Sequence, residues 1–235
     1  MKFQAPKRII RVLDLACGPM LLTPLLEKRY KKMQVDYHGI DLESESLPEL
    51  NPTQTITPHF YRKPLAFTNP TKLRTQLTEL FGATRFHEIH FHMPYNQPEA
   101  SPSAQNALKV IADFLEDGGH FYHVLQEASA LAPTIGRNTT LDEELDNNYG
   151  AAYRKRRKIL QEAATAAGLK LKQYGFRGDS IHSYDWLTET RQSPDENWDA
   201  AEAKHEWIKQ HTREKGLANQ FIVMQKPKQS KRKIL

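Results

Sequence analysis

Residues 12–20 read VLDLACGPM, and this stretch decides the fold. An apolar run carries the acid Asp14 near its end, and a loop of small residues then leads toward a helical pattern of leucines. Short apolar runs bounded by turn residues are typical of buried strands, and small residues let a backbone approach a ligand closely. The stretch predicts a strand at Arg11–Leu15 with a ligand beside its carboxyl end, around Ala16 and Gly18.

Short apolar runs alternate with helical patterns along the rest of the chain. This order is expected of a parallel sheet covered by helices on both faces. Further strands are predicted at Tyr37–Asp41, Ile56–Tyr61, Glu88–Phe91, His120–Leu125, Leu169–Tyr174 and Phe221–Met224. Helices are predicted at Pro19–Tyr30, Thr71–Phe81, Ser103–Leu115 and Ala151–Ala167. The predicted class is α/β, a Rossmann-like sheet of seven mostly parallel strands.

The length of 235 residues suits one domain with a core of its own. Residues 177–217 separate the last two predicted strands and hold all three tryptophans. A hairpin connection needs far fewer residues, and long insertions are commonly functional. We expect a partly helical insertion, with a helix at Trp198–Thr212, inside a single domain at residues 1–225. Residues 226–235 are predicted to form a basic, disordered tail.

Basic charge is concentrated in two places. The net charge is +5, and five bases without an acid lie in the last ten residues, so 28 bases balance 28 acids elsewhere. The tail bases are Lys226, Lys228, Lys231, Arg232 and Lys233. A second run inside a predicted helix consists of Arg154, Lys155, Arg156, Arg157 and Lys158. Both are candidate RNA contacts, because clustered bases attract phosphates; a solvated tail and helix face are the alternative.

The surroundings of the protein are indicated by what the sequence lacks. Cys17 is the single cysteine, so an internal disulfide framework and a cysteine-rich zinc site are excluded. No apolar run has the length that spans a bilayer, and the first residues lack the apolar core of a signal peptide. We expect a cytoplasmic protein without a membrane partner. The oligomeric state is left open.

A second acid-ended strand follows the first, since residues 38–42 read HGIDL. With VLDLACGPM it resembles the first two motifs of the class I S-adenosylmethionine-dependent methyltransferases, and the resemblance covers residues 9–176 and the final strand. The resemblance implies S-adenosylmethionine as the cofactor. In that case Asp41 binds the ribose hydroxyls, and Asp14 binds the ammonium group of the methionine part. The loop that passes close to the cofactor contains Ala16, Cys17 and Gly18, and the adenine is lined by Leu42 and Leu65. Leu42 and Leu65 as core residues are the alternative.

Two other nucleotide folds share this topology. A dinucleotide fold needs G-x-G-x-x-G and places its pyrophosphate at a helix N-terminus, whereas this loop has one glycine and an acid. A phosphate-binding G-x-x-x-x-G-K-[ST] loop does not occur. The alternative to a binding motif is that Asp14 is a helix-capping or loop acid and Gly18 a turn glycine.

The fourth strand ends in a candidate catalytic segment. Residues 89–95 read IHFHMPY, which is similar to the Asn/Asp-Pro-Pro-Tyr motif of amino-group methyltransferases. It also resembles the Phe-Pro-Asp-Pro-Trp motif of tRNA guanine-7 methyltransferases at Phe91 and Pro94. His92 is a candidate proton acceptor, and Tyr95 can stack on a planar substrate. A packed histidine and a loop tyrosine are the alternatives.

Histidines are frequent around this segment. They are His87, His90, His92, His120 and His123. Imidazole is a common metal ligand, but no ligand motif of known spacing occurs among them. The sequence therefore predicts no metal site here.

Three functions are open at this point. The leading hypothesis is an enzyme, an S-adenosylmethionine-dependent methyltransferase that acts on a tRNA or rRNA base. The second is a methyltransferase of small molecules or proteins whose insertion closes over the substrate. The third is a non-catalytic protein that binds S-adenosylmethionine.

Overall fold

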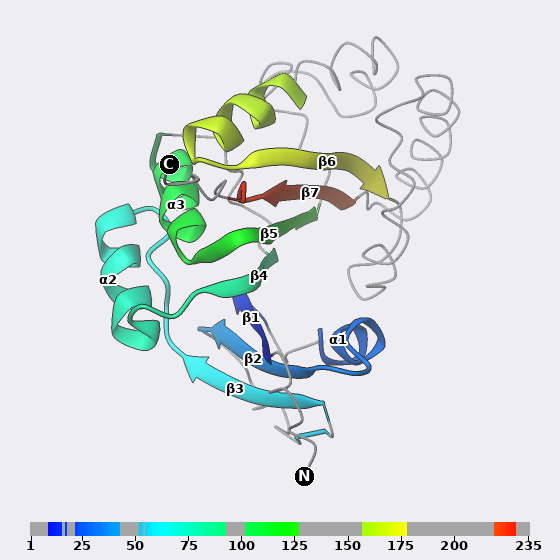
Figure 1. Cartoon of the computed structure of the whole chain (residues 1–235). Helices are drawn as coiled ribbons and strands as arrows, with labels where there is room; N and C mark the ends of the chain where they lie inside the picture. Colours follow the sequence, from blue (N-terminus) through cyan, green and yellow to red (C-terminus); the bar gives the residue numbers. More distant parts are fainter. Residues whose placement is uncertain are drawn as a thin grey trace, which may run out of the picture.

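The computed structural model describes residues 9–15, 17, 22–42, 52–53, 55–92, 102–126, 157–177 and 219–228 (Figure 1). The strands are β1 (Ile9–Leu15), β2 (Gln34–Asp41), β3 (Ile56–Arg62), β4 (Phe86–His92), β5 (Leu115–Gln126), β6 (Lys170–Arg177) and β7 (Asn219–Gln225). The helices are α1 (Thr23–Arg29), α2 (Pro70–Phe81) and α3 (Pro102–Asp113). Residues 157–166 form a further helix before β6.

The strands form one seven-stranded sheet in the order β3-β2-β1-β4-β5-β7-β6. Strands β1 to β5 pair in parallel, and β7 is antiparallel to both β5 and β6. The predicted α/β sheet of mostly parallel strands is therefore confirmed. The order of the strands reverses between β1 and β4, and in such sheets ligands bind beyond the carboxyl ends of the strands at this point.

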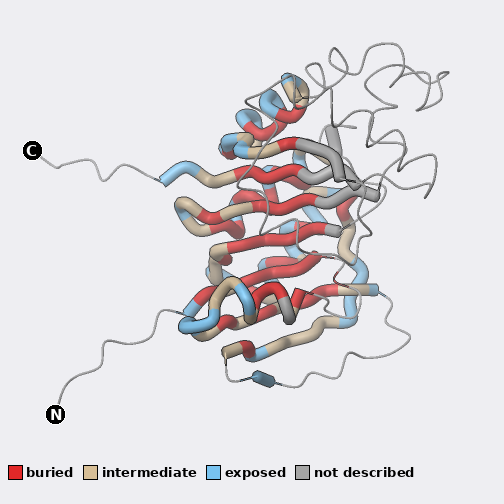
Figure 2. Tube along the Cα trace, turned by 90° about the vertical axis from the view of Figure 1, so that its right-hand side faces the viewer, coloured by how far each residue is buried: buried red, intermediate tan, exposed pale blue. Residues whose placement is uncertain are grey.

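Helices cover both faces of the sheet. Figure 1 shows α2, α3 and the helix at 157–166 on one side and α1 on the opposite side. The larger core cluster packs side chains of α2 and α3 against Leu13, Leu15 and Phe91 of the sheet. The smaller cluster packs Leu25 and Leu26 of α1 against the other face. Buried residues accordingly run through most of the strands in Figure 2.

The first helix is shorter than predicted. The pattern of leucines placed it at Pro19–Tyr30, whereas α1 covers Thr23–Arg29. Pro24 lies in its first turn, where a missing backbone N–H costs nothing; deeper in a helix, proline would remove a hydrogen bond. Pro24 therefore favours the later start.

The junction of α3 and β5 also differs from the prediction. The helix was predicted to reach Leu115, but α3 ends at Asp113 and β5 begins at Leu115, five residues before the predicted strand. The carbonyl of Phe114 accepts a hydrogen bond from the amide of Phe86 at 2.8 Å, which draws the chain into the sheet at this point. Gly118 lies where the register of β5 against β4 shifts, with a positive φ of 84° that glycine adopts without strain.

The first residues of the predicted tail contact the folded part of the chain. The Lys226 Nζ atom donates hydrogen bonds to the carbonyls of Ala112 at 3.1 Å and Leu115 at 2.9 Å. The aliphatic part of Lys228 lies over Gly118. Lys226 is thus engaged within the protein and is not an open RNA contact. Residues 229–235 lie outside the described residues.

Several predictions fall outside the described part of the chain. They concern the helix at Trp198–Thr212, the insertion after Arg177 and the first half of the helix predicted at Ala151–Ala167. Among the described residues, no helix is long and apolar enough to cross a membrane.

Candidate cofactor site at the carboxyl ends of the strands

The carboxyl ends of β1 and β2 meet as predicted. Leu15 pairs with Ile40 in parallel register, and the amide of Cys17 donates a hydrogen bond to the carbonyl of Ile40 at 3.2 Å. Cys17 is thereby held against the end of β2, one residue before Asp41. Cys17 is buried, while Ala16 and Gly18 lie outside the described residues. The structure therefore brings Asp14, Cys17 and Asp41 to one edge of the sheet.

An open hollow lies beside this edge. It is lined by Ile40, Asp41, Leu42, Lys63, Pro64, Leu65 and Phe67. The amide of Lys63 donates a hydrogen bond to the carbonyl of Asp41 at 3.0 Å, so the segments after β2 and β3 form two joined walls. One carboxylate on a mainly apolar wall can bind a ribose and a flat base at the same time.

The two leucines predicted to line the adenine differ in their surroundings. Leu42 is 54% exposed, although it lines the hollow. Leu65 is partly buried and packs against the larger core cluster as well as lining the hollow. An exposed leucine at a hollow has apolar surface for a ligand to cover. Both residues thus lie where a bound base can contact them.

Asp14 is buried at the end of β1, with 1% of its surface exposed. Its Oδ2 atom accepts a hydrogen bond from the hydroxyl of Tyr37 at 2.8 Å. Burial raises the pKa of Asp14 to about 8, the hydrogen bond from Tyr37 opposes this shift, and the charge of Asp41 adds to it. A bound cation would favour the ionised form of Asp14. The pair therefore suits a ligand that carries an ammonium group.

The candidate catalytic segment at residues 89–95 is described only as far as His92. His92 is the last residue of β4, and its backbone pairs with Val124 of β5. The strand end that carries it is adjacent to β1 in the sheet. Tyr95 lies outside the described residues. The roles of His92 and Tyr95 stay predictions.

A buried polar cluster beneath α1 was missed at the level of sequence. Glu88 of β4 is 5% exposed, and its Oε1 atom accepts hydrogen bonds from Arg29 at 2.7 Å and from the hydroxyl of Tyr30. His90 Nε2 lies 3.1 Å from Glu88 Oε2, and its ring stacks on Tyr122 with 4.6 Å between centroids. Glu88 and His90 are two residues apart and share a strand face. That spacing predicts that the side chains of Glu88 and His90 lie next to each other, but it does not predict that Arg29 and Tyr30 contact Glu88.

The histidines of β4 and β5 point to different faces of the sheet. His90 stacks on Tyr122 in the layer beneath α1, whereas His123 stacks on Phe91 of the larger core. His123 is fully buried, and burial lowers its pKa to about 3, so the ring is neutral. The sheet therefore separates His90 from His123.

The predicted basic run is described only at its end. Arg157 is half-buried and Lys158 is exposed on the helix at 157–166. Arg154, Lys155 and Arg156 lie outside the described residues. Lys158 is therefore the residue of this run that the structure places at the surface.

No known protein family and no curated protein matches the sequence. Solved structures do match over nearly the whole chain. One is the protein bound to the Trm112 methyltransferase activator of Haloferax volcanii, which is 13% identical with a TM-score of 0.49, covering 94% of this chain and 86% of that chain. Another is an S-adenosylmethionine-dependent methyltransferase of Methanosarcina mazei, which is 12% identical with a TM-score of 0.49, covering 93% of both chains.

The fold is the Rossmann-like α/β sheet of seven mostly parallel strands that the sequence predicted. Its strand order and its antiparallel β7 confirm the fold that the resemblance implied. A [4+2]-cyclase, SpnF, is also similar, with 12% identity and a TM-score of 0.46, covering 95% of this chain and 76% of that chain. A fold alone does not determine a function, so the function is argued from the residues of the site.

Proposed function

We propose that this protein is an enzyme that transfers a methyl group from S-adenosylmethionine to a base of RNA. The observation that carries the proposal is the hollow at the carboxyl end of β2, where Asp41 lies beside the apolar walls of Leu42 and Leu65. The buried Asp14 next to it adds a second acid. The site has two acids, and the sequence has no glycine-rich phosphate-binding motif. This combination fits a ligand that has a ribose, a base and an ammonium group but no phosphate.

The residues of this site divide the work of binding. Asp41 accepts hydrogen bonds from the ribose hydroxyls, Leu42 and Leu65 hold the base, and Asp14, oriented by Tyr37, binds the ammonium. The bound cofactor supplies a methyl group on a sulfonium, which is open to direct attack by a nucleophile. Transfer of this kind needs alignment and exclusion of water more than acid–base chemistry. His92 accepts a proton from the substrate where the attacking nitrogen carries one, and Tyr95 stacks on the substrate base.

Basic residues support RNA as the substrate. Lys158 is exposed on its helix, and Lys231, Arg232 and Lys233 follow the last described residue, Lys228. Clustered bases bind the phosphate backbone without reading its sequence. They would hold an RNA whose target base enters the site near the end of β4.

The cofactor claim is tested by calorimetry with S-adenosylhomocysteine. We expect wild-type protein to bind it and Asp41→Ala to bind it about 10- to 100-fold more weakly, because hydrogen bonds to a charged group contribute about 1.5–3 kcal/mol. Asp117→Ala removes an exposed acid at the amino end of β5 and is expected to bind like wild type. Folded wild-type protein that does not bind at all would contradict the proposal.

The RNA claim is tested by shortening the chain after Lys228. Removal of the tail is expected to weaken tRNA binding and to reduce the slope of log affinity against log salt by about 0.7–0.9 for each phosphate that the tail neutralises. A full-length variant with Lys231, Arg232 and Lys233 changed to glutamine serves as the matched control for charge. Unchanged affinity and slope in both variants would remove the tail from the RNA surface. Incubation with methyl-labelled cofactor and cell extract tests the substrate directly, since label in a protease-sensitive fraction would contradict RNA.

A further inference from the structure

Three side chains with metal-binding chemistry converge at the β2–β3 edge of the sheet. Asp36 and His38 are two residues apart on β2 and share a face, and His59 of β3 pairs directly with His38. The His38 Nε2 atom lies 3.1 Å from Asp36 Oδ2, and the His59 Nε2 atom lies 2.9 Å from Asp36 Oδ1. Three ligand atoms, one from each residue, lie within 4.8 Å of one another. Residues 23 positions apart are thus brought to one point by the register of two parallel strands.

We propose that Asp36, His38 and His59 form a binding site for a divalent transition-metal ion of the zinc class. Two imidazoles and one carboxylate are a ligand set that zinc accepts, with nitrogen and oxygen ligands at about 2.0–2.2 Å. Ligands at that distance in tetrahedral geometry are about 3.3 Å from one another. Each histidine contacts a different oxygen of Asp36, at 3.1 Å and 2.9 Å, and the three ligand atoms lie within 4.8 Å of one another, so the side chains must draw together to reach this spacing around one ion. Magnesium, which prefers oxygen ligands, does not suit the set.

The second ring nitrogen of His38 has the partner that a metal ligand needs. His38 Nδ1 lies 3.1 Å from the hydroxyl of Tyr61. Histidines that bind metals commonly engage their other ring nitrogen in a hydrogen bond, which fixes the ring and its tautomer. Phe81 and Phe86 pack edge-on against the His38 ring at 5.4 Å and 5.7 Å between centroids. The ring is therefore held in place before any ion arrives.

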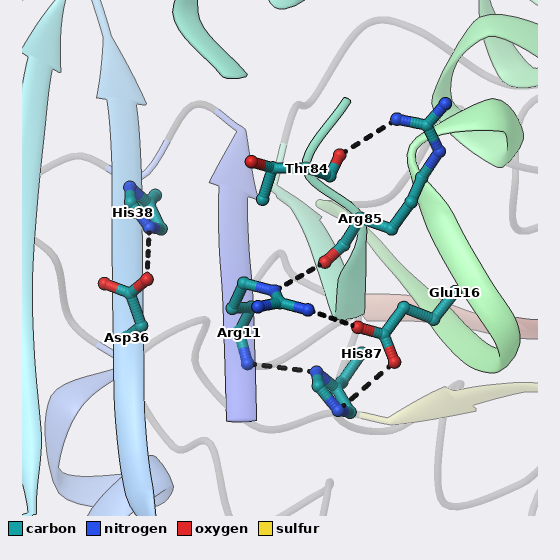
Figure 3. Close-up of polar contacts among 7 residues, drawn as sticks. All are labelled: Arg11, Asp36, His38, Thr84, Arg85, His87 and Glu116. Carbon is teal, nitrogen blue, oxygen red and sulfur yellow. Dashed lines mark hydrogen bonds and ion pairs between the residues drawn. The ribbon is translucent and has the colours of Figure 1, made fainter. Parts of the chain in front are cut away.

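The charges around the three residues allow a cation to bind. Arg11 on the neighbouring strand is a nearby cation, but its guanidinium donates hydrogen bonds to Glu116 at 2.8 Å and to the carbonyl of Arg85 at 2.9 Å. Figure 3 shows these bonds directed away from Asp36 and His38. The side chain of His59 is 43% exposed and that of His38 12% exposed. An ion can thus enter from solvent at His59 and keep water as its remaining ligands.

The proposed metal site is separate from the cofactor site. His38 lies three residues before Asp41 on β2, which corresponds to about 10 Å at a rise of about 3.3 Å per residue. A metal here would join the edge strand β3 to β2 and would take no part in methyl transfer. The proposal therefore does not depend on the proposed function.

Metal binding by the full chain, freed of metal with a chelator, tests the proposal. We expect calorimetry to show one Zn²⁺ per chain, at least ten-fold weaker binding in His59→Gln, and no binding of Mg²⁺. Tyr61→Phe keeps all three ligands and removes the partner of His38; we expect about ten-fold weaker binding, as for other second partners of ligating histidines. Co²⁺ is expected to give visible absorption bands in wild type that are lost in His59→Gln.

A second histidine–carboxylate pair supplies the control. His87 Nε2 lies 3.3 Å from Glu116 Oε2 without a second histidine beside it among the described residues. His87→Gln is expected to bind Zn²⁺ like wild type. Absence of Zn²⁺ binding in wild type, or equal binding in wild type and His59→Gln, would overturn the proposal and leave the three residues as a hydrogen-bonded group.

Discussion

Glu88→Ala is expected to lower the free energy of unfolding by about 3–5 kcal/mol at pH 7, because removing one partner of a buried ion pair leaves the other charge uncompensated. Glu88 lies beneath α1 and binds Arg29 at 2.7 Å, with His90 on its other oxygen. The Arg29 side chain is 20% exposed, so little water can replace the carboxylate. The measurement is urea unfolding followed by circular dichroism.

The conservative change at the same position is the control. Glu88→Gln keeps the size of the side chain and an acceptor for Arg29 and Tyr30, so a smaller loss is expected than in Glu88→Ala. A loss under about 1 kcal/mol in Glu88→Ala, the size measured for solvent-exposed pairs, would contradict the buried-pair description.

Acid should weaken the same cluster. Burial alone would raise the pKa of Glu88, but the hydrogen bond from His90 and the charge of Arg29 hold it at about 2, below its ordinary value of 4.5. A depressed carboxyl pKa gives stability that is present above about pH 4.5 and is lost as the pH falls toward 2. Glu88→Gln is therefore expected to lose less stability than wild type between pH 5 and pH 3.

Binding of S-adenosylhomocysteine is expected to tighten about ten-fold from pH 6 to pH 7, since each pH unit below a ligand-linked pKa changes the ionised fraction about ten-fold. The pKa of Asp14 is about 8 in the protein without a ligand. The proposed complex holds Asp14 as a carboxylate next to an ammonium, so binding releases a proton below pH 8. From pH 6 to pH 7 the α-amino group of the ligand stays protonated, because α-amino groups titrate near pH 8. Calorimetry in buffers of different ionisation enthalpy gives the number of protons released on binding.

Two variants separate this effect from a general one. Asp14→Asn cannot ionise and is expected to bind weakly and without pH dependence. Tyr37→Phe removes the hydrogen bond that opposes the rise in the pKa of Asp14. The affinity of this variant for S-adenosylhomocysteine should therefore continue to increase to a higher pH than that of wild type. Wild-type affinity that does not change from pH 6 to pH 7 would show that Asp14 is not linked to the ligand.

Part of the fold could be predicted because it depends on local pattern. The strands are short apolar runs, and α2 has apolar residues at helical spacing and ends before Gly82. The end of α3 could not be predicted, since Phe114 and Leu115 continue the apolar stripe of the helix. What ends it is the hydrogen bond between Phe114 and Phe86, which are 28 residues apart.

The same distinction holds for the candidate sites. Asp14 and Asp41 could be predicted as site residues from the sequence, because each lies near the end of an apolar strand and the two strands are parallel neighbours. Glu88 could not be assigned a role, because its compensating partners come from α1, nearly 60 residues earlier. The cluster at Asp36 depends on the register of β2 and β3, which the sequence does not specify.

The place of β7 between β5 and β6 has a consequence for synthesis. Within the described sheet, β6 pairs with β7 alone, and β7 follows it by more than 40 residues. During translation β6 leaves the ribosome before its partner strand exists, and one edge of β5 is exposed for the same period. Chains emerge at about 5–20 residues per second, so these unpaired edges persist for seconds and can join other chains. Chains that end before Asn219 should therefore be more prone to aggregate, or to recruit chaperones, than the released full-length chain.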